Sequence, residues 1–393
     1  MTKLRAVLAV SAAALALAVA APTAAPPSRL SAGAGRPAAP EGRIVAVADV
    51  HGAGEAFARI LQRAGLIDDR RQWIGGSAVL VQTGDLLDRG TDIRTALDLL
   101  MSLEPQASAA GGRVQVVLGN HECMNMLGEM RDTAAELFGM FADDKSESRR
   151  EQAFQAATKI GTGAAPDKGA WMAAHPRGYL EYREAFGPAG RYGKWLRSKP
   201  VAVVIEDTLF MHGGINPSFT TDSLDNINKR ARQELAGWDQ GLKWLVTHDL
   251  ALPFSTLSEA AEAAQIEYAR LASRAKQDGT VSEDDAAAAK AILPLVNVGA
   301  SSLLNPDGPL WFRGFSTWTD EEGAPVMAAL LKKYKVKRFV TGHTPQPEGR
   351  IVPRFDNTLF LIDTGMLDGK FYPKGRASAL EIKANVATPI YVE

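Results

Sequence analysis

Short apolar runs alternate with amphipathic segments after residue 42. The apolar runs lie at 44–48, 78–83 and 114–118, and segments with helical spacing follow at 55–64, at 92–103 and after Glu122. Within the first helical segment, Phe57, Ile60 and Leu61 fall on one face. Because the apolar runs do not alternate with polar residues, both of their faces are expected to be buried. The pattern predicts an α/β fold in which a parallel sheet is layered with helices.

Two long segments interrupt this alternation. They run from about 123 to 200 and from 224 to about 295, and both are rich in alanine and charged residues at helical spacing. We interpret them as helical insertions that flank or roof the site. Further strands are predicted at 201–205, 209–211, 338–341, 359–362 and 377–382, and a further helix at 324–334.

The N-terminal segment has the pattern of a secretory signal peptide at residues 1–20. Lys3 and Arg5 precede the apolar run 6–20, which ends in a small-x-small cleavage site. The alternative, an uncleaved anchor, is disfavoured because the run is shorter than the roughly 20 residues of a spanning helix. We expect a periplasmic or secreted protein without stable membrane insertion, a flexible linker at 21–42 and one domain at 43–393.

Composition narrows the class of protein further. The chain is 46% hydrophobic and 23% charged, which is ordinary for a globular protein with a large core. A net charge of -1 leaves no basic surface of the kind that binds nucleic acid. The single cysteine, Cys123, excludes an internal disulfide and an all-cysteine metal site.

Polar side chains follow the predicted strands where each strand ends, and such ends meet at one edge of a sheet. Two carboxylates, one carboxamide and three imidazoles suit borderline cations such as Mn, Zn or Fe. Six ligands exceed the needs of one tetrahedral ion and fit two ions that share a bridging carboxylate. Such a pair polarises a phosphoryl group and generates hydroxide from water. The six candidates are Asp49, His51, Asp85, Asn120, His212 and His343.

Five short motifs occur in a fixed order along the chain. They are Asp-x-His-Gly at 49–52, Gly-Asp-x-x-Asp-Arg-Gly at 84–90, Gly-Asn-His-Glu at 119–122, His-Gly-Gly at 212–214 and Gly-His-Thr-Pro at 342–345. This order resembles the phosphoprotein phosphatase family of binuclear metallophosphatases. Ile-Asp-Thr-Gly-Met stands at 362–366 in place of the toxin-binding loop of eukaryotic members. The chain is therefore most similar to the Shewanella-like branch of bacteria and plants, which implies a calcineurin-like β-sandwich flanked by helices.

The resemblance also implies a role for each candidate. Asp49 and His51 would hold the first metal, Asp85 would bridge, and Asn120, His212 and His343 would hold the second. The cofactor would be two divalent ions, with Mn favoured and Fe or Zn as alternatives. His121 would be the general acid oriented by Asp88, and the substrate phosphate would be bound by Arg89, Asn120 and Arg313. Two residues have alternative interpretations. Arg313 is either a phosphate-binding residue or a surface arginine, and Asp363 is either a partner of a ligand histidine or a turn residue at a strand end.

Several other residues attract attention but are given no role in the chemistry. Position 48 is Ala where the family usually has Gly, which we interpret as a packing position. Cys123 is not a thiol-phosphatase nucleophile, because Glu129 stands where that mechanism needs arginine. His175 and His248 are interpreted as packing or surface residues. The aromatic group in the first insertion is interpreted as helix core; its members are Trp171, Tyr179, Tyr182, Tyr192 and Trp195.

These observations favour a metal-dependent phosphomonoesterase that acts on phosphorylated protein side chains by direct attack of a metal-activated hydroxide. Its partner would be a phosphorylated protein or peptide, and no nucleic acid. The resemblance favours phosphotyrosine, and the sequence leaves phosphoserine and phosphothreonine open. The alternative is a dinucleoside polyphosphate hydrolase or a broad small-molecule phosphatase, although an exported protein would rarely meet a cytosolic dinucleotide. A non-catalytic binding module is disfavoured by the intact ligand set.

Overall fold

The computed structural model describes residues 42–160, 166–219, 222–367, 369 and 371–392. The predicted signal peptide and almost all of the predicted linker lie outside these residues. Among the described helices, none is long and apolar enough to cross a membrane.

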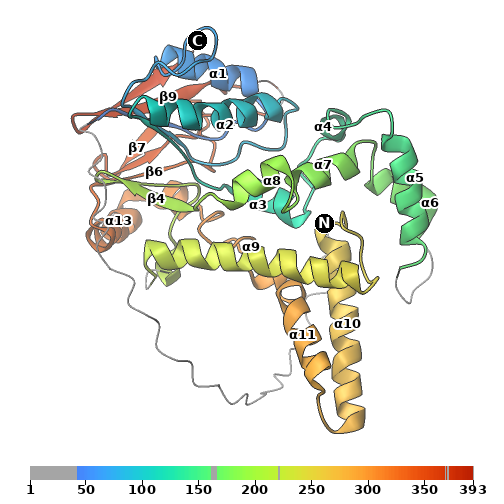
Figure 1. The fold of residues 1–393 in the computed structure, drawn as a ribbon. Coiled ribbons are helices and arrows are strands. Elements are labelled where there is room, and N and C mark those ends of the chain that lie inside the picture. The colour runs from blue at the N-terminus through green and yellow to red at the C-terminus, as the bar shows by residue number, and fades with distance from the viewer. Residues whose placement is uncertain (1–41, 161–165, 220–221, 368, 370, 393) are drawn as a thin grey trace. The chain divides into compact units, whose positions relative to one another are not determined.

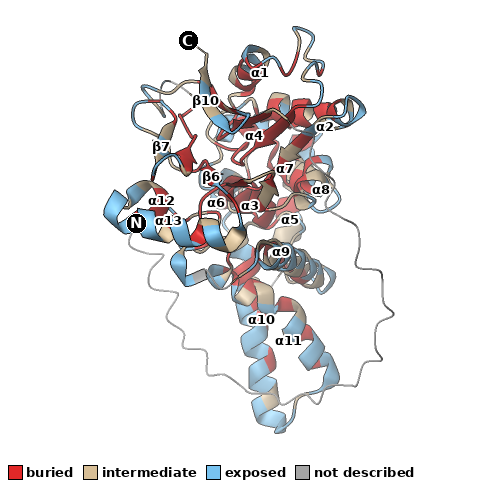
Figure 2. Ribbon diagram, turned by 90° about the vertical axis from the view of Figure 1, so that its left-hand side faces the viewer, coloured by how far each residue is buried: buried red, intermediate tan, exposed pale blue. Residues whose placement is uncertain are grey.

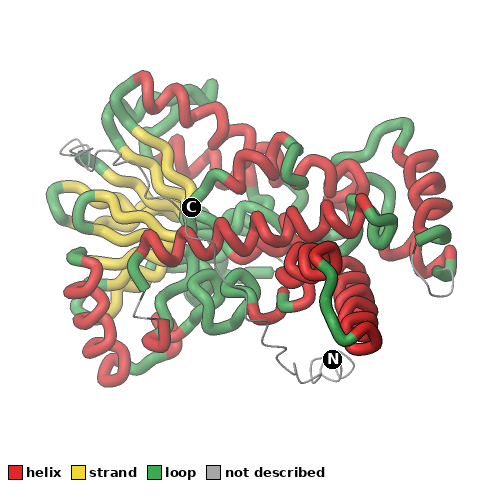
Figure 3. Tube along the Cα trace, turned by 60° about the horizontal axis from the view of Figure 1, so that its bottom comes forward, coloured by secondary structure: helices red, strands yellow, loops and turns green. Residues whose placement is uncertain are grey.

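The strands form two mixed five-stranded sheets, and many of the helices lie to one side of these sheets (Figures 1 and 3). In the first sheet β1, β2 and β3 are parallel, and β9 and β10 continue it in antiparallel order. In the second sheet β5, β6 and β8 are parallel, with antiparallel β4 and β7 at its edges. The first sheet comprises β10 (Val386–Tyr391), β9 (Ser378–Lys383), β1 (Ile44–Val47), β2 (Val79–Gln82) and β3 (Arg113–Val116). The second comprises β4 (Ala202–Ile205), β5 (Thr208–Met211), β6 (Arg338–Thr341), β8 (Leu359–Leu361) and β7 (Val352–Arg354).

The two sheets pack face to face, and this packing explains the uninterrupted apolar runs. In β1, Ile44 and Ala46 belong to the core between the sheets, whereas Val45 and Val47 belong to the core under the helices. Phe360 of β8 likewise joins the core between the sheets. The expected β-sandwich is confirmed. The interpretation as a parallel sheet layered with helices was wrong in part, because one face of each sheet is covered by the other sheet.

Most of the predicted elements are present, with small shifts at their ends. The strand predicted at 338–341 is β6 itself. Of the edge strands, β7 was not predicted, and β10 lies in a C-terminal tail that was expected to be rich in strands but in which only the strand at 377–382 was specified. Each carries a proline, Pro353 and Pro389 respectively, and proline is tolerated only where a strand needs no ladder hydrogen bond. The helices that cover the sheets are α1 (Gly54–Arg63), α2 (Ile93–Ala109), α12 (Gly314–Thr317) and α13 (Asp320–Tyr334).

The first helical block follows α3 (Asn120–Leu127), which begins at the end of β3. Its helix α7 packs against α3 and against α4 and α8 of the same block. Most aromatic side chains of this block are core, as predicted: Tyr182 is fully buried, and His175 is buried and stacked on Trp171, whereas Trp195 is half-buried. The helices of this block are α4 (Ala135–Gly139), α5 (Ser146–Ala157), α6 (Lys168–Ala174), α7 (Tyr179–Phe186) and α8 (Arg191–Arg197).

The second helical block is built from α9 (Leu224–Thr247), α10 (Leu257–Asp278) and α11 (Glu283–Val296). Helix α9 contacts α3 and β4. Helices α10 and α11 form an antiparallel pair that projects from α9, and much of its surface is exposed (Figures 1 and 2). His248, just after α9, is exposed, as predicted. Two short 3-10 turns, Pro217–Phe219 and Val298–Ala300, flank this block.

Candidate metal centre and active site

All six predicted ligands lie at the carboxyl ends of parallel strands. Asp49 and His51 follow β1, Asp85 follows β2, and Asn120 follows β3. His212 follows β5 and His343 follows β6, so both sheets contribute. Each of the six is at most 4% exposed. The loops at this edge are strained, because several residues have a positive φ: His51, Asp85, Asp88, Arg89 and His343.

The loops after β2 and β3 touch at a glycine. Gly84 has a φ of +93°, and a Cβ atom there would lie 2.4 Å from the backbone nitrogen of Gly119. The Glu122 carboxylate then joins the two loops, because it accepts hydrogen bonds from the backbone N–H groups of Asp85, Leu86 and Gly119 at 2.7–2.8 Å. Glu122 lay in a motif identified in the sequence, but no role was predicted for it. It holds the Asp85 backbone in place.

Asp85 stands between two groups of ligand atoms. One group is His51, Asp85 and His121, the other is Asp85, His212 and His343, and the atoms of each group lie within 4.8 Å of one another. Oδ2 of Asp85 is 3.6 Å from His51 Nε2 and 3.1 Å from His212 Nε2. His212 Nε2 is also 2.9 Å from Asn120 Oδ1. The structure therefore brings all the predicted ligands of the second ion together around the predicted bridge.

Three histidines of the centre share one arrangement. One ring nitrogen of each histidine lies 2.9 Å from a neutral backbone carbonyl oxygen. His51 contacts the carbonyl of Leu87, His212 contacts that of Thr83, and His343 contacts that of Trp311. The other ring nitrogen faces the centre. Burial lowers the pKa of His51 and of His343 well below the ordinary value. Neutral imidazole with a fixed tautomer is the form that binds a metal ion.

Two buried carboxylate oxygens at this edge have no hydrogen-bond partner among the described residues: Oδ2 of Asp49 and Oδ2 of Asp363. Burial, and then repulsion from Asp363 and Asp85, raise the pKa of Asp49. Burial is also the main reason why the pKa of Asp363 is raised to about 6. Unpaired buried carboxylates are costly unless a cation compensates them. The donor set therefore fits divalent metal ions.

The contacts of Asp363 support the strand-end turn, one of its two predicted roles. Asp363 follows β8, the strand beside β6, so its carboxylate joins those at the other strand ends. Its Oδ1 accepts a hydrogen bond from the backbone N–H of Gly365 at 2.9 Å, as in a strand-end turn. On the neighbouring strand, a Cβ at Gly342 would lie 2.3 Å from Oδ1 of Asp49, so only glycine leaves room for that carboxylate. Asp363 is thus a turn residue that also adds negative charge beside Asp49.

His121 differs from the other histidines of the centre. Its Nδ1 lies 2.7 Å from a carboxylate oxygen, Oδ2 of Asp88. The second carboxylate oxygen of Asp88 accepts a hydrogen bond from the Thr133 hydroxyl at 2.6 Å. Burial opposes protonation of His121, but the carboxylates of Asp85 and Asp88 outweigh it and raise the pKa of His121 to about 9. An imidazolium held in this way can donate a proton.

Two arginines lie beside the centre. Arg89 is half-buried and contacts the Tyr372 hydroxyl, with its Nη2 at 3.4 Å from His121 Nε2. Arg313 is exposed and donates to the backbone carbonyl of His343 at 2.9 Å, which places it at the rim of the site. Tyr372 was missed in the sequence, because nothing near it in the chain marks it as a neighbour of Arg89.

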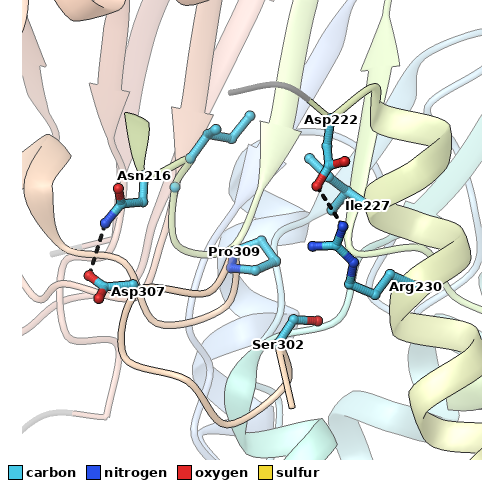
Figure 4. Close-up of a pocket in the computed structure, with 9 residues that line it drawn as sticks. Asn216, Asp222, Ile227, Arg230, Ser302, Asp307 and Pro309 are labelled. Atoms are coloured by element: carbon cyan, nitrogen blue, oxygen red, sulfur yellow. Dashed lines mark hydrogen bonds and ion pairs between the residues drawn. The ribbon is translucent and has the colours of Figure 1, made fainter. Parts of the chain in front are cut away.

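A small hollow borders the loop that carries His212 (Figure 4). Its volume is only about 10 Å³. Its polar groups already pair with one another: Arg230 with Asp222 at 2.8 Å, and Asn216 with Asp307 at 2.9 Å. The hollow therefore has room for about one water molecule and no free group for a ligand.

Comparison with known proteins agrees with this geometry. A protein named Shewanella-like protein phosphatase 1, from Plasmodium berghei (strain Anka), is 25% identical over 328 residues, 83% of this chain and 67% of the relative. Shewanella-like protein phosphatase 2 of Arabidopsis thaliana is 32% identical over 212 residues, 51% of this chain and 52% of the relative. The predicted similarity to the Shewanella-like branch is confirmed.

A solved structure has the same fold. It is described as the cold-active protein-tyrosine phosphatase of a psychrophile Shewanella sp., and it matches 90% of this chain and 82% of its own with a TM-score of 0.55 and 23% identity. The family model for the calcineurin-like phosphoesterase matches residues 42–269. With the metal-ligand motifs at the strand ends, this match means that the chain belongs to the calcineurin-like phosphoesterase family.

Proposed function

We propose that this protein is a metal-dependent phosphoprotein phosphatase. The observation that carries the proposal is the different partnering of the four histidines at the centre. His51, His212 and His343 each contact a neutral carbonyl, which suits metal ligands, whereas His121 contacts the carboxylate of Asp88. A centre with both metal ligands and a separate proton donor suits cleavage of a phosphate ester with a poor leaving group.

In this proposal two divalent ions, Mn being favoured, are bound by the six predicted ligands. Asp49 and His51 hold the first, Asp85 bridges, and Asn120, His212 and His343 hold the second. Bound there, such ions polarise the phosphoryl oxygens and generate a nucleophile from water near neutral pH. The donor set supports this assignment, because it combines imidazoles with carboxylates and includes the unpaired Oδ2 of Asp49.

The remaining polar residues act on the substrate. Arg89 and Arg313 present planar guanidinium groups to the phosphate from two sides of the centre, and the Asn120 amide assists. His121 gives its proton to the departing oxygen, and Asp88 holds the ring in place through Nδ1 and stabilises the imidazolium. The alternative role for His121 is a metal ligand, because its Nε2 lies 3.8 Å from Oδ2 of Asp85.

The substrate class comes from the relatives, whose names describe protein phosphatases. We favour phosphotyrosine because the solved structure with the same fold is described as a protein-tyrosine phosphatase. The test is an assay of the purified, metal-loaded protein on a phosphotyrosine peptide, a phosphoserine peptide and diadenosine tetraphosphate. We expect the peptides to be hydrolysed faster. A preference for diadenosine tetraphosphate would overturn the assignment in favour of the dinucleotide alternative.

The place of action is also part of the proposal. The pattern at residues 1–20 supports export to the periplasm or the medium, where the substrate would be an extracytoplasmic phosphoprotein. The mass of the mature protein, purified from the cells that express it, tests this. A protein that still begins at Met1 would contradict export with cleavage.

A further inference from the structure

A chain of buried hydrogen bonds connects the first helical block to the pair formed by His121 and Asp88. The Tyr182 hydroxyl on α7 donates to Oδ1 of Asn125 on α3. The Asn125 amide in turn donates to Oδ2 of Asp88 at 2.8 Å. The same Asp88 oxygen lies 2.7 Å from Nδ1 of His121. Tyr182, Asn125 and Asp88 are fully buried, so water does not compete for these hydrogen bonds.

The orientation of the Asn125 amide follows from its neighbours. Its Nδ2 contacts two groups that can only accept, the Asp88 carboxylate and the backbone carbonyl of His121, both at 2.8 Å. Its Oδ1 contacts a hydroxyl that can donate. The reversed amide would turn its oxygen toward a carboxylate and a carbonyl, which is repulsive. The hydroxyl of Tyr182 therefore helps to keep the amide donor directed at Asp88.

Tyr182 is itself held by packing that does not depend on its hydroxyl. Its ring lies against Phe138, Phe141 and Phe186, with centroid distances of 4.5–5.2 Å. Burial raises the pKa of Tyr182 well above the ordinary value, so the hydroxyl keeps its proton. Arg183, the next residue of α7, donates to the backbone carbonyl of Asn125 at 2.7 Å. Helix α7 thus fixes Asn125 at two points (Figure 1 shows α7 beside α3).

We propose that Asn125 and Tyr182 are positioning residues for the proton donor, so that the first helical block sets how efficiently His121 serves the leaving group. The inference rests on the proposed role of His121. Without the amide, Oδ2 of Asp88 would keep only its contact with His121, and the carboxylate could turn away from the geometry that orients the ring. The block would thereby act on the chemistry through Asp88 without touching the substrate.

The test uses the full, metal-loaded protein and a series of aryl phosphates from phenyl phosphate to 4-nitrophenyl phosphate. The readout is the slope of log kcat/KM against the acidity of the leaving group, because only a defect in proton donation makes poor leaving groups suffer more. Tyr182→Phe keeps the ring and removes only the hydroxyl. We expect it to slow phenyl phosphate about threefold to tenfold, the worth of one hydrogen bond, and 4-nitrophenyl phosphate less. Asn125→Ala should steepen the slope further.

Tyr179→Phe is the matched control. Tyr179 is also buried on α7, but its hydroxyl donates to the backbone carbonyl of Phe254 at 3.0 Å, away from Asp88. It should lose a similar amount of stability and leave the slope unchanged. Metal content, measured on every variant, should match that of the wild type.

Two outcomes separate the inference from the proposed function. If His121→Asn steepens the slope and Tyr182→Phe slows all substrates equally, the inference is wrong and the role of His121 stands. If His121→Asn itself leaves the slope unchanged, the role of His121 and the inference fall together. As a second measure, Tyr182→Phe in an Asp88→Asn background should cause no further change of slope, because both act through one contact.

Discussion

The strand ends and the first helical block contribute differently to the same buried site. The strand ends supply charged or metal-binding side chains on short, strained loops. The helical block supplies hydrogen-bond donors, such as the Tyr182 hydroxyl, that reach the site through α3. Changes at the strand ends should therefore alter ion binding or the chemical step itself, whereas changes in the block should alter only how well the reacting side chains are oriented.

A third region, the second helical block, takes part in neither task directly. Helix α9 packs against α3 and β4, and α10 and α11 extend from it with largely exposed surfaces. Its link to the first block includes His175, whose Nε2 lies 3.7 Å from a carboxylate oxygen of Glu259 on α10. Substitutions in this block should mainly change the stability of the fold.

The largest effect is expected for Asp85→Asn. Asp85 lies between both ligand groups, and an amide cannot balance the charge of two ions. Turnover should fall by at least about a thousandfold, close to 4 kcal/mol of barrier. Metal content should drop toward one ion or none. Elemental analysis together with steady-state kinetics checks this prediction. Two tightly bound ions and near-normal turnover in the variant would contradict the role of Asp85 as the bridging ligand.

The next comparison sets His121→Asn against His212→Asn. His121→Asn should keep both ions and lose about 10²–10⁴ in rate on phosphopeptides, with a smaller loss on 4-nitrophenyl phosphate. His212→Asn should lose an ion and slow every substrate alike, because its Nε2 faces Asp85 and Asn120. The two roles are distinguished by measuring, for each variant, the number of bound metal ions and the turnover of substrates with two different leaving groups. Loss of an ion from His121→Asn would make His121 a ligand.

A smaller effect, on folding, is expected from Gly84→Ala. The new Cβ would meet the backbone of Gly119, in addition to the cost of the positive φ. Gly111→Ala is the matched control, because Gly111 also has a positive φ but no atom within 4 Å of the added Cβ. The control should cost about 1–2 kcal/mol of unfolding free energy. Gly84→Ala should cost clearly more in denaturant melts and also displace Asp85; equal losses would mean that the loop contact contributes nothing.

The smallest effect is expected at Glu259 in the second block. Burial favours a raised pKa, but the nearby His175 ring and the hydrogen bond from the Thr256 backbone outweigh it, so the pKa of Glu259 is lowered. A carboxylate whose pKa is lowered by folding stabilises the fold at a pH above its pKa in the unfolded chain. This contribution is lost as the pH falls below about 4. Because Glu259 is partly exposed, the effect should be slight. Denaturant melts of Glu259→Gln should show less acid destabilisation than the wild type, and identical pH profiles would refute the link.

Much of the site could be predicted from the sequence, because each ligand lies in a short motif directly after an apolar run. The candidate ligands, Asp49, His51, Asp85, Asn120, His212 and His343, were all selected in this way, and the structure places them at the ends of parallel strands. The fold was harder to predict from the sequence. Edge strands with Pro353 or Pro389 lack the apolar run that marks β1 or β6, and the second sheet came only from the family resemblance.

What the sequence by itself determined is therefore local: which strands are buried, which helices follow them, and which candidate ligands stand at the strand ends. These depend on periodicity and on neighbours within a few positions of the chain. Only the tertiary structure decided that Asp363 lies beside Asp49, and that Tyr182 bonds Asn125 across 57 positions. Such contacts depend on how separate elements pack and on side-chain directions after packing, and no local pattern of residues encodes them.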